Sequence, residues 1–234
     1  MWIELFLFLL LAHLMADFVF QTSASCKSKA EKHWVSVHQY IHALIVFALA
    51  WLVSWDASFW WAALIIGLAH LGLDIWKSYC PETVVWFSVD QLLHISVIAF
   101  AAWAWSCRSS WGIPLGIDVA IVAYADAFLM CWKPANFFIK LMLKHYSVNM
   151  PADNASGFNA GALIGTVERW LILIFVCMQR YEALGLLIAA KSIIRYSEKD
   201  TERTEYVLAG TLLSIFIAVN MGLIVMIYTK EIHV

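Results

Sequence analysis

Long apolar blocks separated by short polar segments dominate this sequence and restrict the folds open to it. A helix of about 20 apolar residues crosses a bilayer core of about 30 Å. Only 14% of the residues are charged, against about 25% in soluble domains, and 63% are hydrophobic. We therefore predict an all-α fold, a polytopic transmembrane helix bundle. About eight spans are expected, by block length, at residues 2–20, 36–54, 58–77, 84–106, 115–132, 158–178, 181–195 and 204–228.

Two features suggest how these spans are organised. The segment 133–146 carries Phe137 and Phe138 beside lysines, which is typical of one interfacial helix lying on the membrane. The polar stretch 151–159 is the best candidate boundary. We predict an N-terminal transmembrane half at 1–150, which includes the interfacial helix, and a C-terminal transmembrane half at 151–234.

The Lys and Arg residues are distributed unevenly over the loops, and this bias predicts the orientation. Only Arg108, Arg180 and Lys230 fall in one set of loops, and the richer set should face the cytoplasm. Both termini are then expected outside the cytoplasm. The richer set holds Lys27, Lys29, Lys32, Lys77, Lys133, Lys140, Lys144, Lys191, Arg195, Lys199 and Arg203.

Each of the first four predicted spans carries two ionisable residues four positions apart, which lie on the same face of a helix. Given the predicted orientation, all four pairs fall in the cytoplasmic third of the membrane. The orientation came from Lys and Arg, so the common depth is an independent observation. The pairs are His13 and Asp17, His38 and His42, His70 and Asp74, and Asp90 and His94.

These eight residues are candidate metal ligands, because a buried charge costs at least about 2.5–3.5 kcal/mol in a bilayer unless it has a partner. Histidine and carboxylate together suit zinc, with manganese or iron as alternatives, and one or two divalent ions are expected. Two ions and a bridging hydroxide would balance three aspartates. Hydrogen bonds between helices, neutral His–Asp pairs or a proton relay are the alternatives.

Three residues of this region are candidates for catalysis. Asp74 and Asp90 could orient a water bound to the metal, and Lys77, one turn beyond Asp74, could stabilise a leaving oxygen. Lys77 could equally be an ordinary lysine that extends to the inner interface.

The C-terminal half carries a second polar group. Arg169, Lys191 and Arg195 could bind an anion such as phosphate. Alternatively, these cations could form interhelical ion pairs with Glu168 and Glu205 that hold the half together.

Several motifs of the chain resemble one known family. They are H-L-M-A-D-F-V-F-Q-T at 13–22, H-x3-H at 38–42, H-L-G-L-D-I-W-K at 70–77, D-Q-L-L-H at 90–94, I-G-T-V-E-R-W at 164–170, A-A-K-S-I-I-R-Y at 189–196 and E-Y-V-L-A-G-T-L-L-S at 205–214. With these motifs the chain resembles an uncharacterised bacterial inner-membrane family, the domain of unknown function DUF3307. The resemblance implies a bacterial inner-membrane location and brings no activity. The His and Asp pattern is more loosely similar to that of membrane-bound metal-dependent hydrolases.

Together these patterns predict a membrane-embedded metal-binding protein. Its function would be metal-dependent hydrolysis of a phosphoester or lipid-linked substrate near the cytoplasmic face, with membrane lipid as a partner. A divalent-metal or proton transporter, an oxygen-activating di-iron enzyme, and a metal-stabilised scaffold or sensor for partner proteins are the alternatives. A net charge of −2 gives no reason to expect nucleic acid.

Overall fold

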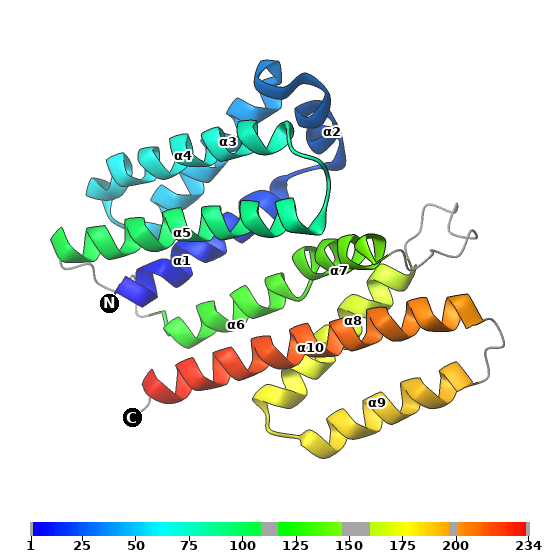
Figure 1. Cartoon of the computed structure of the whole chain (residues 1–234). Helices are drawn as coiled ribbons and strands as arrows, with labels where there is room; N and C mark the ends of the chain where they lie inside the picture. The colour runs from blue at the N-terminus through cyan, green and yellow to red at the C-terminus, as the bar shows by residue number, and fades with distance from the viewer. Residues whose placement is uncertain (1, 109–116, 147–159, 197–200, 233–234) are drawn as a thin grey trace. The chain divides into compact units, whose positions relative to one another are not determined.

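The computed structural model describes residues 2–108, 117–146, 160–196 and 201–232 (Figure 1). All regular secondary structure in these ranges is helical, which confirms the predicted all-α class. A π-helical turn, η1, continues the first helix, and the short 3-10 helices η2 and η3 precede α3 and α4. The elements are α1 (Trp2–Leu14), η1 (Met15–Phe20), α2 (Ser23–Lys32), η2 (His33–Val35), α3 (Val37–Ser54), η3 (Ala57–Phe59), α4 (Trp60–Ser78), α5 (Val84–Arg108), α6 (Val119–Met130), α7 (Lys133–His145), α8 (Ala160–Cys177), α9 (Tyr181–Tyr196) and α10 (Thr201–Ile232).

Several helices are long and apolar enough to cross a membrane. Within the described residues there are 5 such segments, and they correspond to the first four and the last of the predicted spans. Helices also form at the other predicted positions. The 12 residues of α6 give a helix of only about 18 Å, shorter than a bilayer core. The total of about eight spans therefore stays a prediction. The five segments are Trp2–Phe20, Val37–Ser54, Ala57–Ser78, Val84–Arg108 and Glu205–Thr229.

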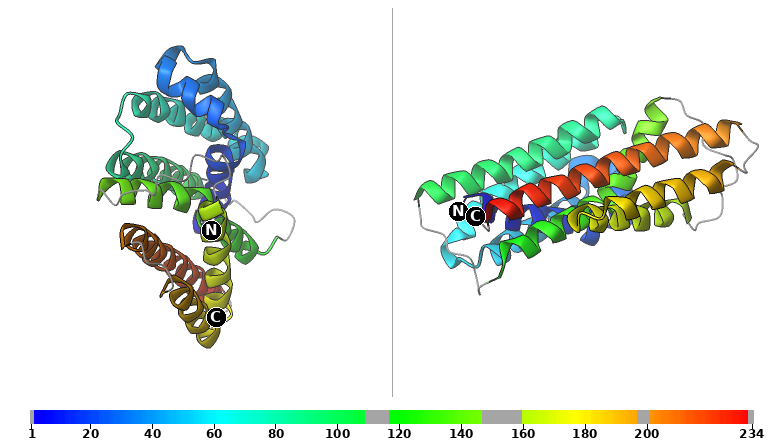
Figure 2. Two further views of the ribbon diagram at one scale, coloured as in Figure 1. Left: turned by 90° about the vertical axis from the view of Figure 1, so that its right-hand side faces the viewer. Right: turned by 90° about the horizontal axis from the view of Figure 1, so that it is seen from below.

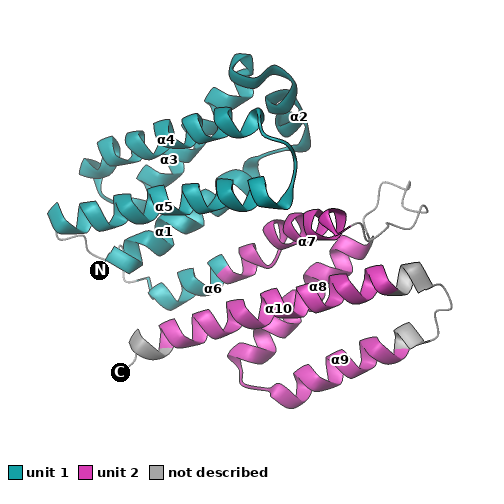
Figure 3. Cartoon of the chain, in the orientation of Figure 1, with its two compact units in different colours: residues 1–126 teal, residues 127–234 magenta. Residues whose placement is uncertain are grey.

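The chain divides into two compact units, which Figure 3 shows in different colours. Unit 1 comprises residues 1–126 and unit 2 comprises residues 127–234. The division falls inside α6, so the end of α6 and the whole of α7 belong to unit 2, whereas the sequence places a boundary at 150/151, among residues outside the described ranges. The reason is packing, because α7 contacts α8 and α10 of unit 2.

Unit 1 is built on four long helices, α1, α3, α4 and α5, which lie side by side in Figures 1 and 2. Helices α3 and α4 pack most extensively in this unit, and Gly67 lies at their contact. A Cβ at Gly67 would lie 3.1 Å from Phe47 Cβ and 3.3 Å from the Ala43 carbonyl oxygen. Small residues allow such close approach between apolar helices.

The interior of unit 1 changes character along the length of the bundle. One end is an apolar core that includes Leu5, Leu9, Phe59, Ala63 and Trp105. These residues come from the beginning of α1, the beginning of α4 and the end of α5. The other end of the same bundle holds the buried histidines and aspartates. Helix α2 and the connection between α4 and α5 belong to this polar end (Figure 1).

Unit 2 contains the end of α6 together with α7, α8, α9 and α10, and α8 and α10 pack most extensively in it. At Gly222 of α10 an added Cβ would lie 2.7 Å from Val176 Cγ1 of α8, so only glycine fits this approach. Helix α7 is strongly amphipathic. Its buried face includes Ile139 and Leu141, and its lysines at 133, 140 and 144 are exposed.

Candidate metal centre

Four helices of unit 1 bring their ionisable residues together at the polar end of the bundle. The first contribution comes from the junction of α1 and η1, where the backbone passes into a π-helical turn, a feature frequent at functional sites. The other residues project from the first half of α3, the second half of α4 and the first half of α5. Three overlapping groups each have their donor atoms within 4.8 Å of one another. These groups and their contacts define the His/Asp cluster: His13, Asp17, His42, His70, Asp74, Asp90 and His94.

The tightest part of the cluster is a triangle of three donor atoms. His42 Nε2 lies 3.0 Å from His70 Nε2 and 3.2 Å from Asp17 Oδ1, and His70 Nε2 lies 3.4 Å from Asp17 Oδ1. With metal–ligand bonds of about 2.0–2.1 Å, neighbouring donors are about 3.0 Å apart in octahedral and about 3.4 Å apart in tetrahedral coordination. The triangle therefore has the dimensions of one face of a coordinated divalent ion.

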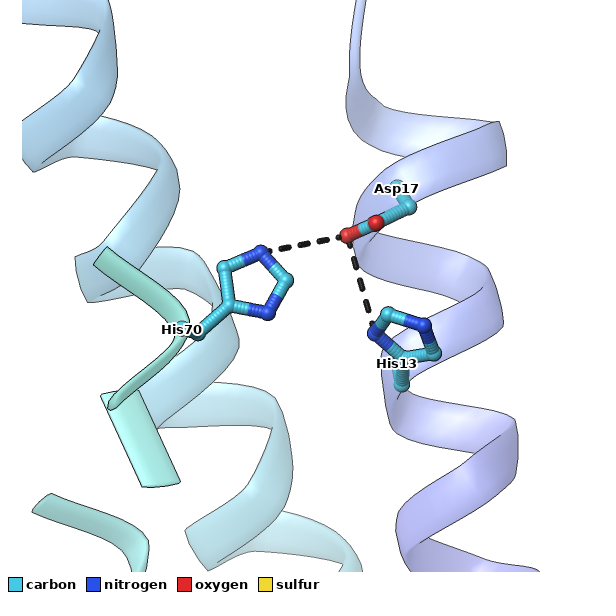
Figure 4. Close-up of side chains that lie close together, drawn as sticks. All are labelled: His13, Asp17 and His70. Carbon is cyan, nitrogen blue, oxygen red and sulfur yellow. Dashed lines mark ion pairs between the residues drawn. The ribbon is translucent and has the colours of Figure 1, made fainter. Parts of the chain in front are cut away.

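The Asp17 carboxylate has a histidine ring on each of two sides. Figure 4 shows its carboxylate between the His13 and His70 rings. His13 Nδ1 lies 3.7 Å from Asp17 Oδ1. One carboxylate thus joins the histidine of its own helix to those of α3 and α4.

Asp74 lies on the next side of the triangle. Its Oδ2 is 3.7 Å from His42 Nε2, and its Oδ1 is 3.8 Å from His70 Nε2. The same Oδ1 lies 3.9 Å from His94 Nε2, so Asp74 connects the triangle to the second donor group of Asp74, Asp90 and His94.

The hydrogen bonds of His94 determine which of its ring nitrogens can bind a metal. Its Nδ1 lies 2.9 Å from the Asp90 carbonyl oxygen, which can only accept, so Nδ1 carries the proton and donates. In the neutral ring Nε2 is then an acceptor, and it is buried without a hydrogen-bond partner among the described residues. It faces the Asp74 carboxylate, which is also an acceptor. A histidine that donates its second nitrogen to a carbonyl is the usual arrangement of a metal ligand.

A lysine that the sequence analysis counted only as a loop charge also belongs to this site. Lys29 of α2 is 7% exposed, and its Nζ lies 2.5 Å from Asp74 Oδ2. With the Gln21 amide suitably oriented, Lys29 Nζ also donates to the Gln21 oxygen at 2.9 Å. No hydropathy or spacing signal marks this residue, because α2 is polar throughout and lies outside the predicted spans.

Two predicted site residues lie elsewhere. His38 is exposed and outside the cluster, so the pair with His42 does not converge. The buried face of α3 runs through Gln39, His42 and Val46, and His38 lies beside that face. Lys77 is half-buried, and among the described residues its ammonium makes no hydrogen bond or ion pair. The lysine that contacts Asp74 is Lys29, and not Lys77 as the sequence suggested.

The predicted anion group belongs to unit 2, where two of its cations have protein partners. Arg169 is buried and donates to the Cys131 carbonyl, to Asn136 Oδ1, to Ser214 Oγ and to Thr166 Oγ1. Lys191 is paired with Glu168, which corresponds to the interhelical alternative. The side chain of Arg195 lies outside the described residues.

Towards the apolar end of the bundle, the cluster borders a narrow cavity. His13, His70 and His94 line one side of it, and aliphatic side chains such as Leu9 and Ile66 line the other. Its interior has room for no more than about one water molecule. Beyond it lies the apolar core.

Residues 5–115 match the family model described as a protein of unknown function (DUF3307). The match confirms the resemblance inferred from the motifs at 13–22, 38–42, 70–77 and 90–94. The match covers all seven members of the His/Asp cluster and Lys29, so the matched segment contains the whole candidate centre. No curated protein and no solved structure matches the chain.

Proposed function

We propose that this chain is a membrane-embedded metal protein that holds a divalent ion on His42, His70 and Asp17. The observation that carries the proposal is the triangle of donor atoms with edges of 3.0, 3.2 and 3.4 Å. The three residues come from three different helices, and none is near another in sequence. Two imidazoles and one carboxylate at these separations are the ligand set of many catalytic metal sites.

Zinc is the proposed metal. Zinc binds histidine nitrogen and carboxylate oxygen, and three protein ligands leave a fourth position open for water. Iron(II) and manganese(II) would use the same face with more open positions.

The proposed reaction is hydrolysis of a phosphoester or a lipid-linked substrate. A bound divalent ion lowers the pKa of its water towards about 7, which supplies a nucleophile at neutral pH. Asp74 faces the open side of the triangle and could orient that water, while Asp90 supports the orientation of His94. Lys29, rather than Lys77, is the cation in contact with Asp74.

The substrate is expected to approach from the cytoplasmic side of a bacterial inner membrane. The excess of Lys and Arg in one set of loops supports this orientation, and the cluster lies at the end of the bundle that carries those loops. Recognition of phosphate by Arg169 and Lys191 has less support, because both cations are engaged within unit 2.

A proton relay is the second candidate, because the 3.0 Å separation of His42 Nε2 and His70 Nε2 also fits an N–H···N hydrogen bond. Transport of protons or metal would require polar groups along the rest of the bundle. The core beyond the cluster is apolar, at Leu5, Leu9 and Ile98, so an enzyme or sensor with one-sided access has more support.

Metal analysis of the purified full-length protein tests the proposal. Wild type should retain about one zinc per chain after dialysis, and His42→Ala should lose most of it. His38→Ala is the matched control, because His38 is an exposed residue on the same helix, and it should keep the zinc. A metal-free wild type with unchanged stability would favour the hydrogen-bonded relay.

Hydrolysis is tested with the same proteins. The zinc-loaded wild type should cleave a phosphodiester reporter, and a chelator should abolish cleavage. Asp74→Asn should lose about 10²-fold or more in rate while zinc stays bound, since a positioned base contributes about 10²–10⁴-fold. A zinc-loaded protein without activity on phosphoester or lipid-linked reporters would contradict the hydrolase and leave the metal site intact.

A further inference from the structure

Helix α2 brings a positive charge, that of Lys29, into the His/Asp cluster, and the consequence for metal binding rests on the proposed metal site. Lys29 Nζ is 2.5 Å from Asp74 Oδ2, and the lysine and aspartate side chains are 9% and 14% exposed. At this distance, in a poorly hydrated environment, an ammonium strongly affects any other cation held by the same carboxylate.

Helix α2 holds this lysine firmly. The Thr22 side chain caps the start of α2 by accepting from the Ser25 amide at 3.2 Å. In the middle of α2, Ser28 Oγ lies 2.9 Å from Ser36 Oγ, next to the start of α3. Lys29 is thus fixed against the cluster by contacts on both sides.

The charges of the cluster limit how many ions it can hold. Its three aspartates and Lys29 leave two negative charges when the histidines are neutral, as metal ligands must be. One divalent ion cancels that charge. With a hydroxide bridging the two ions, a second divalent ion would leave a surplus of about one positive charge in a buried site, which is unfavourable.

The donor atoms alone would allow a second ion. Asp74, Asp90 and His94 form a group within 4.8 Å, and both Asp90 Oδ1 and His94 Nε2 are buried without a hydrogen-bond partner among the described residues. Without the lysine charge, two divalent ions and one bridging hydroxide would balance the three aspartates. We propose that Lys29 sets the metal content of the centre, restricting it to one divalent ion by occupying Asp74.

The experiment uses full-length protein in detergent, saturated with zinc, freed of excess metal, and analysed for zinc per chain. Wild type and Lys29→Arg, which keeps the charge, should hold about one ion, the number that balances the cluster charge. Lys29→Gln, which keeps a hydrogen-bond donor for Asp74, should hold about two. Lys27→Gln is the matched control on the same helix, because Lys27 is 77% exposed and paired with Glu31, and it should hold about one.

The outcomes separate this inference from the proposed function. A wild type without zinc would refute the metal site itself. A wild type with about one zinc and a Lys29→Gln protein with the same or less would refute the role of Lys29 alone. If Lys29→Gln does not fold without metal, the number of zinc ions per chain is measured instead by refolding the variant at increasing zinc concentration. Recovery that requires about two ions per chain supports the inference, and recovery with one overturns it.

Discussion

Replacing Arg169 by methionine should destabilise unit 2 strongly, because this side chain joins three of its helices. The guanidinium is 1% exposed and donates to the Cys131 carbonyl at 2.6 Å, Asn136 Oδ1 at 2.6 Å and Ser214 Oγ at 2.9 Å. Methionine matches the aliphatic part of the arginine side chain and has no hydrogen-bond donor. Among the described contacts, the Cys131 carbonyl and Asn136 Oδ1 would then have no donor.

The magnitude follows from those acceptors. Each buried acceptor left without a donor costs about 1–3 kcal/mol, so two cost about 2–6 kcal/mol. The methionine variant recovers part of this, because it no longer buries a charge. A net loss of about 3 kcal/mol lowers the melting temperature of a unit of about 100 residues by roughly 10 °C or more.

The assay is thermal unfolding of the detergent-solubilised protein, followed by size-exclusion chromatography of heated samples. Lys191→Met is the control, because Lys191 is 32% exposed and forms one ion pair, with Glu168. Such a pair contributes at most about 1 kcal/mol. If Arg169→Met melts within a few degrees of Lys191→Met, the hydrogen-bond network does not stabilise unit 2. If added phosphate raises the melting temperature of wild type but not of Arg169→Met, the anion site is correct instead.

Two further predictions concern the membrane and the helix packing. Thiol labelling of single cysteines introduced at the exposed Lys27 and at Ser109 should occur from opposite sides of the membrane, and labelling of both from one side would contradict the common depth of the His and Asp pairs. Gly67→Leu should cost about 1–3 kcal/mol by overpacking against Phe47. Gly72→Leu, where an added Cβ meets nothing within 4 Å, should be nearly neutral, and equal effects of the two in the same thermal assay would refute the close approach.

The convergence of the buried His and Asp side chains was predictable, because membrane helices give polar residues few permitted places. A His or Asp inside a long apolar block must face the interior of the bundle, and the spacing of four residues defines the face. This reasoning identified His13, Asp17, His70 and Asp74 without knowledge of which helices are neighbours. It required only that spans alternate in direction.

The same reasoning misplaced His38, because it assumed that residues four positions apart on a helix are always buried together. Residues four apart differ by about 40° around a helix, and a buried stripe can include one and exclude the other. On α3 the buried stripe continues from His42 to Gln39, at the opposite edge from His38. His38 also lies in the first turn, where the helix end is exposed.

Lys29 could not be predicted, because its contact depends on how a short polar helix folds back over the bundle. Nothing in the local sequence distinguishes it from Lys27 or Lys32 on the same helix. The boundary of the units has a similar cause. The sequence marks a polar stretch at 151–159, but the packing of α7 against α10 determines which unit α7 joins.

The position of Lys29 also bears on how the cluster enters a membrane. The first four spans carry aspartates and histidines in their interiors, and an additional lysine there would add about 2.5–3.5 kcal/mol to the insertion of its span. Lys29 belongs instead to α2, which is not a span and reaches Asp74 from the end of the bundle. The compensating charge of Lys29 can therefore reach Asp74 after the four helices have assembled. If the proposed ion binds, it and Lys29 both offset the charge of the buried aspartates, and we expect the metal-free protein to unfold at a lower temperature than the metal-loaded one.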